Sequence, residues 1–207
     1  MIYLDYSANT PINKEVLESF NKVALGFPAN PNSLHSLGVK AKELIDASTK
    51  QIADILKINT NEIIYTSYSS EANNLALKGI AYKYQNRGKH IITTPLEHSS
   101  IYGPLNFLQT QGFEVDFVNL KDDGTIDFEH LKTLLREDTI LVSVNAVNSE
   151  IGILQPINEI GKLIKENSKA FFHSDVTQAV GKIKVDFTNV DLASFTAHKF
   201  FGINGIG

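Results

Sequence analysis

Lys199 is the residue whose position in this chain most favours covalent chemistry. It follows an apolar segment, residues 190–196, that is expected to form a buried strand, and glycines follow it at positions 202, 205 and 207. A lysine placed there lies at the carboxyl end of a strand, where open α/β sheets bind their ligands. Partial burial lowers the pKa of such an amine and suits it to Schiff-base formation. A surface lysine beside a loop histidine is the alternative interpretation.

Other polar side chains also follow predicted strands. Ser69 and Ser70 come after a segment expected to end near residue 66, and they begin a helix whose free N–H groups and hydroxyls can bind phosphate. Three further polar residues stand at strand ends: His98 follows the predicted strand 89–94, Asn148 follows 139–145, and Asp175 ends 170–175. Because the ends of parallel strands meet at one edge of a sheet, we expect these residues to lie together.

This combination of groups matches the needs of pyridoxal phosphate. The aldehyde of that cofactor condenses with a lysine, here Lys199, while a carboxylate, here Asp175, keeps the pyridine nitrogen protonated. His98 would stack on the ring, and Ser69 and Ser70 would hold the phosphate; no metal ion is needed. Taken singly, Asp175 and His98 are better explained as helix caps or structural hydrogen bonds. Their joint occurrence at successive strand ends favours the cofactor site.

The elements that must position these groups alternate along the chain. Strands are predicted at 2–4, 63–66, 89–94, 113–120, 139–145, 170–175 and 190–196, and a short helical turn at 177–181. Helices are predicted at 14–24 after Asn13, at 39–56, at 127–136 with Asp127 as cap, and at 156–167. The apolar spacing in 39–56 indicates an amphipathic core helix. Apolar strands separated by helices predict an α/β fold with a mostly parallel sheet and helices on both faces.

Composition excludes several functions. With 207 residues, 43% of them hydrophobic, the chain can bury a full core. The net charge of -4 and the lack of a basic block argue against nucleic-acid binding. The longest apolar runs are strand-sized and the start lacks signal-peptide features, so we expect no membrane partner and a cytoplasmic location. The absence of cysteine excludes disulfides, thiolate metal sites and a cysteine nucleophile within these residues.

Seven motifs, which occur in order along the chain, make the sequence similar to a known family. They are Tyr3–Pro11, Ser33–Gly38, Glu71–Gly79, Glu97–His98, Asn148–Gly152, His173–Ile183 and Ser194–Lys199. In these motifs the sequence resembles the N-terminal half of class V aminotransferase-family enzymes, and most closely the cysteine desulfurases. The resemblance implies the large domain of an aspartate-aminotransferase-like fold (fold type I), with a mainly parallel, mixed sheet. It also implies that residues 1–12 pack with a small domain, while 13–207 form an incomplete large domain.

The resemblance extends the list of candidate site residues. It implies that Lys199 forms the Schiff base, that Asp175 pairs with the pyridinium and that His98 also assists proton transfer. It adds Gln178 for the ring hydroxyl, Asn148 beside that oxygen and the substrate carboxylate, and Thr196 and His198 for the phosphate. The family usually has a glycine-containing turn where this chain reads Tyr68-Ser69-Ser70. A side chain there replaces glycine where backbone would approach phosphate closely.

The implied reaction converts L-cysteine to L-alanine and passes sulfur to an enzyme cysteine. That cysteine is absent from these residues, so we expect a truncated chain that is inactive alone. The resemblance also implies a homodimer, a sulfur-acceptor or scaffold protein, and a role in iron–sulfur cluster assembly. Three alternatives remain open: a selenocysteine lyase or other class V aminotransferase, a non-catalytic fragment that binds a full-length partner, and an α/β domain without cofactor.

Overall fold

The computed structural model describes residues 2–207, which form two compact units. The larger unit contains residues 2–10, 66–200 and 204–207, and the smaller one contains 11–65 and 201–203. No helix within 2–207 is both long enough and apolar enough to cross a membrane.

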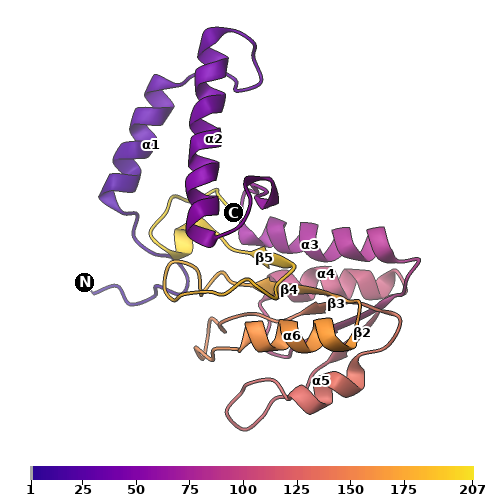
Figure 1. The fold of residues 1–207 in the computed structure, drawn as a ribbon. Helices are drawn as coiled ribbons and strands as arrows, with labels where there is room; N and C mark the ends of the chain where they lie inside the picture. The colour runs from indigo at the N-terminus through magenta and orange to yellow at the C-terminus, as the bar shows by residue number, and fades with distance from the viewer. Residues whose placement is uncertain (1) are drawn as a thin grey trace. The chain divides into compact units, whose positions relative to one another are not determined.

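A five-stranded sheet organises the larger unit (Figure 1). Its strands are β1 (His90–Thr93), β2 (Glu114–Phe117), β3 (Thr139–Ser143), β4 (Phe171–Asp175) and β5 (Leu192–Ser194). They lie in the order β2-β1-β3-β4-β5, and each neighbouring pair is parallel. The predicted α/β fold with a mainly parallel sheet is confirmed. Each strand falls inside its predicted range and is shorter than that range.

The register of the sheet brings the ends of β1, β2 and β3 level, and β4 and β5 extend slightly further in the same direction. Thr93 of β1 pairs with Ser143 of β3, Ser143 pairs with His173 of β4, and Asp175 pairs with Ser194 of β5. β2 lies on one side of β1, and β3 lies on the other side. The order of the strands therefore reverses between β1 and β3. Loops that leave this point diverge and open a crevice at the carboxyl ends of the strands.

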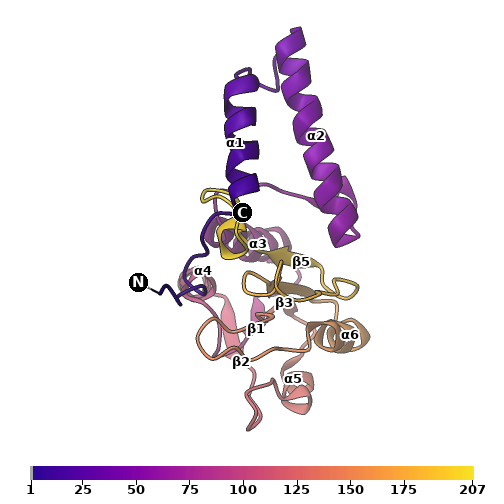
Figure 2. The same ribbon diagram turned by 90° about the vertical axis from the view of Figure 1, so that its left-hand side faces the viewer.

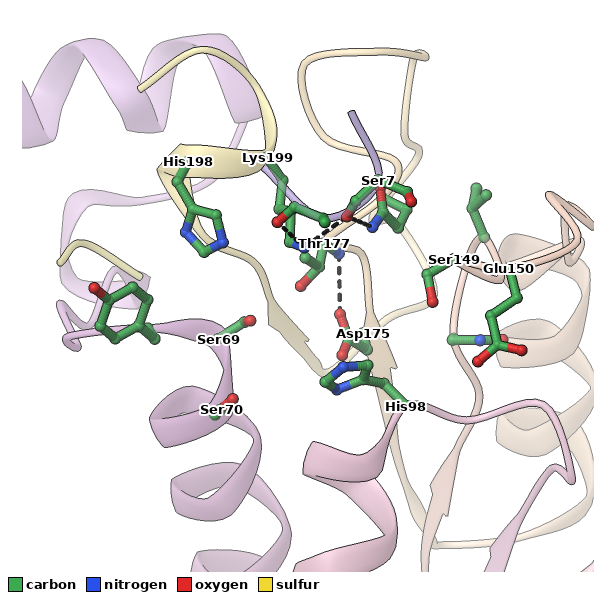
Figure 3. A pocket seen from close by; sticks show the side chains of 15 residues that line it. Ser7, Ser69, Ser70, His98, Ser149, Glu150, Asp175, Thr177, His198 and Lys199 are labelled. Atoms are coloured by element: carbon green, nitrogen blue, oxygen red, sulfur yellow. Dashed lines mark hydrogen bonds between the residues drawn. The ribbon is translucent and has the colours of Figure 1, made fainter. Parts of the chain in front are cut away.

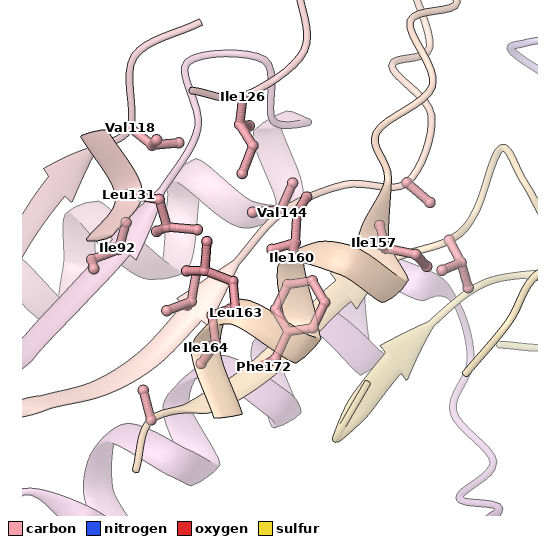
Figure 4. Close-up of a cluster of buried hydrophobic side chains, with 14 of the residues drawn as sticks. Ile92, Val118, Ile126, Leu131, Val144, Ile157, Ile160, Leu163, Ile164 and Phe172 are labelled. Atoms are coloured by element: carbon pink, nitrogen blue, oxygen red, sulfur yellow. The ribbon is translucent and has the colours of Figure 1, made fainter. Parts of the chain in front are cut away.

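Helices cover both faces of the sheet, as expected for strands that are apolar on both sides (Figures 1 and 2). The four helices of this unit are α3 (Ser69–Tyr84), α4 (Ser99–Thr110), α5 (Phe128–Leu134) and α6 (Ile157–Asn167). Neighbouring residues of one strand serve opposite faces: Ile91 packs in the core that includes α3 and α4, while Ile92 packs in the core that includes α5 and α6. Figure 4 shows the second of these cores around Phe172.

The helix starts follow local sequence signals. Asp127 accepts hydrogen bonds from the backbone of Glu129 and His130, which confirms it as the cap of α5. Pro156 was predicted as the first residue of a helix, but it is the N-cap of α6, which begins one residue later at Ile157. A proline fits the start of a helix because its missing N–H would have no partner there.

The smaller unit contains two long helices and one short turn of 3-10 helix. They are α1 (Lys14–Gly26), α2 (Ser36–Leu56) and η1 (Thr60–Glu62). Asn13 caps α1 through a 2.8 Å bond from the backbone of Glu15, as predicted. The interpretation of 39–56 as a core helix was wrong, because Val39 and Ile45 are each 45% exposed and Ile55 is 78% exposed. The apolar spacing predicts the helix but does not say what covers its face.

Three predicted elements are absent from the described chain. Residues 2–4 form no strand; the Tyr3 hydroxyl instead donates to the carbonyls of Asp5 and Asn9 within a turn. Residues 63–66 also form no strand, and Thr66 exchanges two 2.8 Å backbone bonds with Gly207. Residues 177–181 form turns rather than a helix. Each of these segments makes local or isolated bonds, so it does not join the sheet or a helix.

We expect Gly161→Ala to destabilise the larger unit by about 1–3 kcal/mol. Gly161 lies in α6, and a Cβ built there would collide with the backbone carbonyl of Asn189. Gly79→Ala in α3 is the matched control, since a Cβ there meets nothing within 4 Å. The control should be neutral or stabilising by up to about 1 kcal/mol. Denaturant unfolding measures both changes; equal stability of the two variants would contradict the close approach of α6 to residue 189.

Candidate active site

A pocket of about 380 Å³ lies at the carboxyl edge of the sheet (Figure 3). Its walls come from residues 7–8, from the start of α3, from the loops after β1, β3 and β4, and from the short 3-10 helix η2 (Ala197–Lys199). Seven of the nine predicted site residues line it: Ser69, Ser70, His98, Asp175, Gln178, His198 and Lys199. His98, Asp175 and Lys199 end or follow strands as expected, whereas Ser69 and Ser70 enter at the start of α3, where the predicted strand 63–66 is absent.

The amine of Lys199 is half-buried at this pocket. Its Nζ donates to the carbonyl oxygens of Ser7 at 2.6 Å and Ala8 at 2.8 Å. Burial lowers the pKa of Lys199, and the negative charges of Asp5 and Asp175 partly offset that effect. A lowered pKa makes the unprotonated amine, which is the nucleophilic form, more available near neutral pH.

Asp175 ends β4 with its carboxylate held from two sides. Oδ1 accepts a 3.0 Å bond from the backbone N–H of Thr177, and Oδ2 accepts a 2.8 Å bond from the side chain of Asn73. The residue is 7% exposed, yet it lines the pocket. Fixed donors and restricted exposure give the carboxylate one orientation toward a bound group.

The first turn of α3 supplies the anion-binding part of the pocket. Tyr68 precedes this helix and makes no side-chain cap bond, while Ser69 and Ser70 line the pocket. The first N–H groups of a helix have no partner within the helix, so they favour an anion such as phosphate. His198 lines the same pocket, and its ring contacts that of Tyr68 edge-on with centroids 5.6 Å apart. Burial and the charge of Lys199 lower the pKa of His198.

Two predicted site residues do not line the pocket. The Thr196 hydroxyl is buried, where it donates to the carbonyl of Ile206 at 2.8 Å and lies 3.1 Å from Nδ1 of His198. The side chain of Asn148 is engaged by its own loop: Nδ2 donates to the Leu96 carbonyl, and Oδ1 accepts two backbone N–H groups. In this structure Thr196 therefore supports His198, and Asn148 joins the loops after β1 and β3.

Gln178 reaches the pocket wall through two polar contacts. Its Nε2 donates to the Ser7 carbonyl at 2.8 Å, and its Oε1 accepts from Nζ of Lys182 at 2.6 Å. Ser7 is also the partner of Lys199, so both side chains hold the same N-terminal loop at the pocket. That loop is fixed further by two bonds from Thr10 to the carbonyl of His198.

Glu97 is a functional candidate that the sequence reasoning did not single out. Its carboxylate is buried, and Oε1 accepts a 2.7 Å bond from the backbone of Asn145 and a 3.3 Å bond from the Thr94 hydroxyl. Burial raises the pKa of Glu97 to about 8, with a further contribution from the charge of Asp175. Glu97 thus joins the loops on either side of the point where the strand order reverses. The available signal was an acidic residue in the loop after the predicted strand 89–94, directly before His98.

The residues at this pocket fit pyridoxal phosphate. They provide an amine for an aldehyde, a carboxylate for a pyridinium nitrogen, an imidazole for a ring face and an uncapped helix start for a phosphate. Thr177 also lines the pocket, and its buried hydroxyl has no hydrogen-bond partner among the described residues. The volume lies within the range of about 300–1,000 Å³ that is usual for cofactor pockets.

Comparison with known proteins assigns the chain to a family. The family model described as aminotransferase class-V matches residues 2–207. The chain belongs to the class V aminotransferase family. This enzyme family and its fold were the ones predicted from the motifs, so both predictions are confirmed.

Individual relatives support a narrower resemblance. Cysteine desulfurase IscS of Buchnera aphidicola is 44% identical over 211 residues, which cover 100% of this chain and 52% of the relative. A solved NifS-like protein superposes with a TM-score of 0.96 at 34% identity, covering 100% of this chain and 57% of that one. SspA, solved in complex with cysteine, superposes with a TM-score of 0.94 at 36% identity, covering 100% of this chain and 60% of that one. The chain spans about half the length of the curated relative.

We expect Glu97 to contribute a term to the free energy of unfolding that falls as pH rises from about 5 to about 8. Its pKa is raised on folding, so the folded state binds the extra proton in this range and loses that advantage as the proton leaves. Glu97→Gln has a side chain of the same size that does not titrate. It should make the free energy of unfolding depend less on pH, by up to about 1.4 kcal/mol per pH unit. Glu137→Gln, at an exposed position, is the control. Identical pH profiles of unfolding free energy for wild type and Glu97→Gln would contradict the assignment.

Proposed function

We propose that this pocket binds pyridoxal phosphate through Lys199, and that the protein carrying it is a cysteine desulfurase. The supporting observation is the convergence of three unlike groups on one pocket. These are the amine of Lys199, the buried carboxylate of Asp175 and the uncapped first turn of α3. A structural cap or surface charge explains any one of them, but it gives no reason for all three to share a cavity.

Each group has a distinct binding role in this proposal. Lys199 holds the aldehyde carbon, Asp175 holds the ring nitrogen, and Ser69 and Ser70 hold the phosphate together with His198. Gln178 binds the ring hydroxyl in this proposal. Bound there, the cofactor supplies an electron sink for the bonds of an amino-acid substrate. Thr196 acts through His198, and Asn148 acts through the loop that it shares with Ser149 and Glu150.

The chain's own residues also account for proton movement. With its pKa lowered by burial, Lys199 is the amine suited to take a proton from the α-carbon of an amino acid and later return one. The carbonyls of Ser7 and Ala8 hold its Nζ in position until it is engaged. His98 lies beside Asp175 at the pocket (Figure 3), where its ring would face the bound cofactor.

We propose that the substrate is L-cysteine and that the product is L-alanine. Support comes from similarity to proteins named cysteine desulfurase and to SspA, which was solved in complex with cysteine. These 207 residues contain no cysteine, so the thiolate that accepts sulfur comes from outside them. A homodimer, a sulfur-acceptor or scaffold protein, a cytoplasmic location and the packing of residues 1–12 with a small domain are part of the proposal.

We expect Lys199 to be the lysine that carries the cofactor. Borohydride reduction of the protein with pyridoxal phosphate, followed by peptide mapping, should place the pyridoxyl group on Lys199, and Lys199→Ala should remove both the label and the visible absorption band. Lys182 is an internal control, since its amine contacts Gln178 near the same pocket. Labelling of Lys182 or of another lysine in the wild-type protein would overturn the assignment.

We expect the full-length protein that carries this chain to release alanine from L-cysteine, and Asp175→Ala to reduce this rate by a factor of a hundred or more, on the order of the loss of one general catalytic group. Alanine is quantified under reducing conditions with and without added pyridoxal phosphate. The 207-residue chain alone should show no sustained sulfur release, because it lacks a thiolate acceptor. Full activity of Asp175→Ala would contradict the role of the carboxylate and restrict it to capping the turn at Thr177.

A further inference from the structure

Asn73 lies behind the pocket and links two of its side chains. It is fully buried in α3, and its Nδ2 lies 2.8 Å from Oδ2 of Asp175 and 2.9 Å from Oγ of Ser100. A side-chain amide nitrogen carries two hydrogens, so each contact receives one. The reverse orientation of the amide would place its oxygen against the carboxylate of Asp175, which the contact distance forbids. The observed bonds therefore define which way this amide points.

The hydroxyl of Ser100 extends the link from Asn73 to His98. Because Ser100 Oγ accepts from Asn73, its own hydrogen remains free to donate to Nδ1 of His98, which is 2.8 Å away. The backbone N–H of Ser100 donates to the same Nδ1 at 3.1 Å. A nitrogen that accepts two hydrogen bonds carries no hydrogen of its own. The proton of the neutral His98 ring is therefore on Nε2.

We propose that Asn73 is a positioning residue that couples Asp175 to His98 and, through Ser100, holds His98 with its proton on Nε2. His98 then presents a hydrogen-bond donor to the pocket rather than an acceptor. Nε2 cannot take up a proton that it already carries, so removal of a substrate proton falls to Lys199. Only this last consequence rests on the proposed function; the tautomer and the coupling are properties of the chain itself.

The tautomer is measured by long-range proton–nitrogen NMR of the full-length protein labelled with ¹⁵N-histidine. The signal of His98 is assigned from its loss in His98→Gln. We expect the neutral form of the His98 ring to carry its proton on Nε2 and none on Nδ1, without added cofactor. A proton on Nδ1, or an equal mixture of the two tautomers, would overturn the proposal. Because no cofactor is present, this result is independent of whether the pocket binds pyridoxal phosphate.

Variants of Ser100 test the donor chain. Ser100→Ala leaves Nδ1 with the backbone donor alone, so the fraction of His98 with its proton on Nε2 should fall. Ser100→Thr keeps the hydroxyl and should restore the wild-type signal. Ser99→Ala, at an exposed neighbouring position, is the control and should leave the signal unchanged. An unchanged tautomer in Ser100→Ala would show that the hydroxyl does not contribute.

A double-mutant cycle on cofactor affinity tests the coupling. Asn73→Ala removes a hydrogen bond to a charged carboxylate, so we expect pyridoxal phosphate to bind roughly tenfold or more weakly. Asn74→Ala is the matched control, because its amide bonds to the helix carbonyl of Ser70 and to no pocket side chain among the described residues. The double variant Asn73→Ala/Ser100→Ala should lose much less than the product of the two single losses, since both act through one chain of bonds.

Additive losses in that cycle would refute the coupling, as would equal affinities for Asn73→Ala and Asn74→Ala. Thermal melts identify any variant that fails to fold. If Asn73→Ala does not fold, the NMR comparison of Ser100→Ala with Ser100→Thr still decides the proposal. Failure of the wild-type protein to bind pyridoxal phosphate would refute the proposed function and leave the tautomer measurement standing.

Discussion

The parallel pairing of the five strands is the constraint on which the site depends. Parallel strands must all end at the same edge, and the level register from Thr93 through Ser143 to His173 makes that edge sharp. His98, Asp175 and Lys199 reach one cavity because each ends or follows a strand, while Ser69 and Ser70 reach it at the start of α3. The reversal of strand order between β1 and β3 then separates two loops and leaves room for a ligand.

Buried polar side chains hold that edge in place from behind. Glu97 joins the loops after β1 and β3. His173 spans three strands, since its Nδ1 lies 2.9 Å from the Ser143 hydroxyl and its Nε2 lies 3.0 Å from that of Ser194. Burial lowers the pKa of His173 to about 4, although the nearby charge of Asp175 acts in the opposite direction. A neutral ring can bridge these hydroxyls without placing a second charge beneath the carboxylate.

Much of this arrangement could be predicted from the sequence, because strand ends and helix starts carry local signals. Lys199, Asp175 and the serines that begin α3 all stand at such positions. The support groups could not be predicted in the same way. Asn73 and Asp175 are 102 residues apart in sequence, and their contact depends on how α3 packs over the sheet. The exposed apolar face of α2 is a second example. Sequence periodicity predicts that this helix has an apolar face, but it does not predict which residues, if any, pack against that face.

The most direct test is a crystal structure of the protein grown with pyridoxal phosphate. The account predicts continuous density between the cofactor and Nζ of Lys199, the ring nitrogen at Asp175, and the phosphate at the first turn of α3 beside Ser69 and Ser70. Attachment to another lysine, or a phosphate bound away from that helix start, would contradict it.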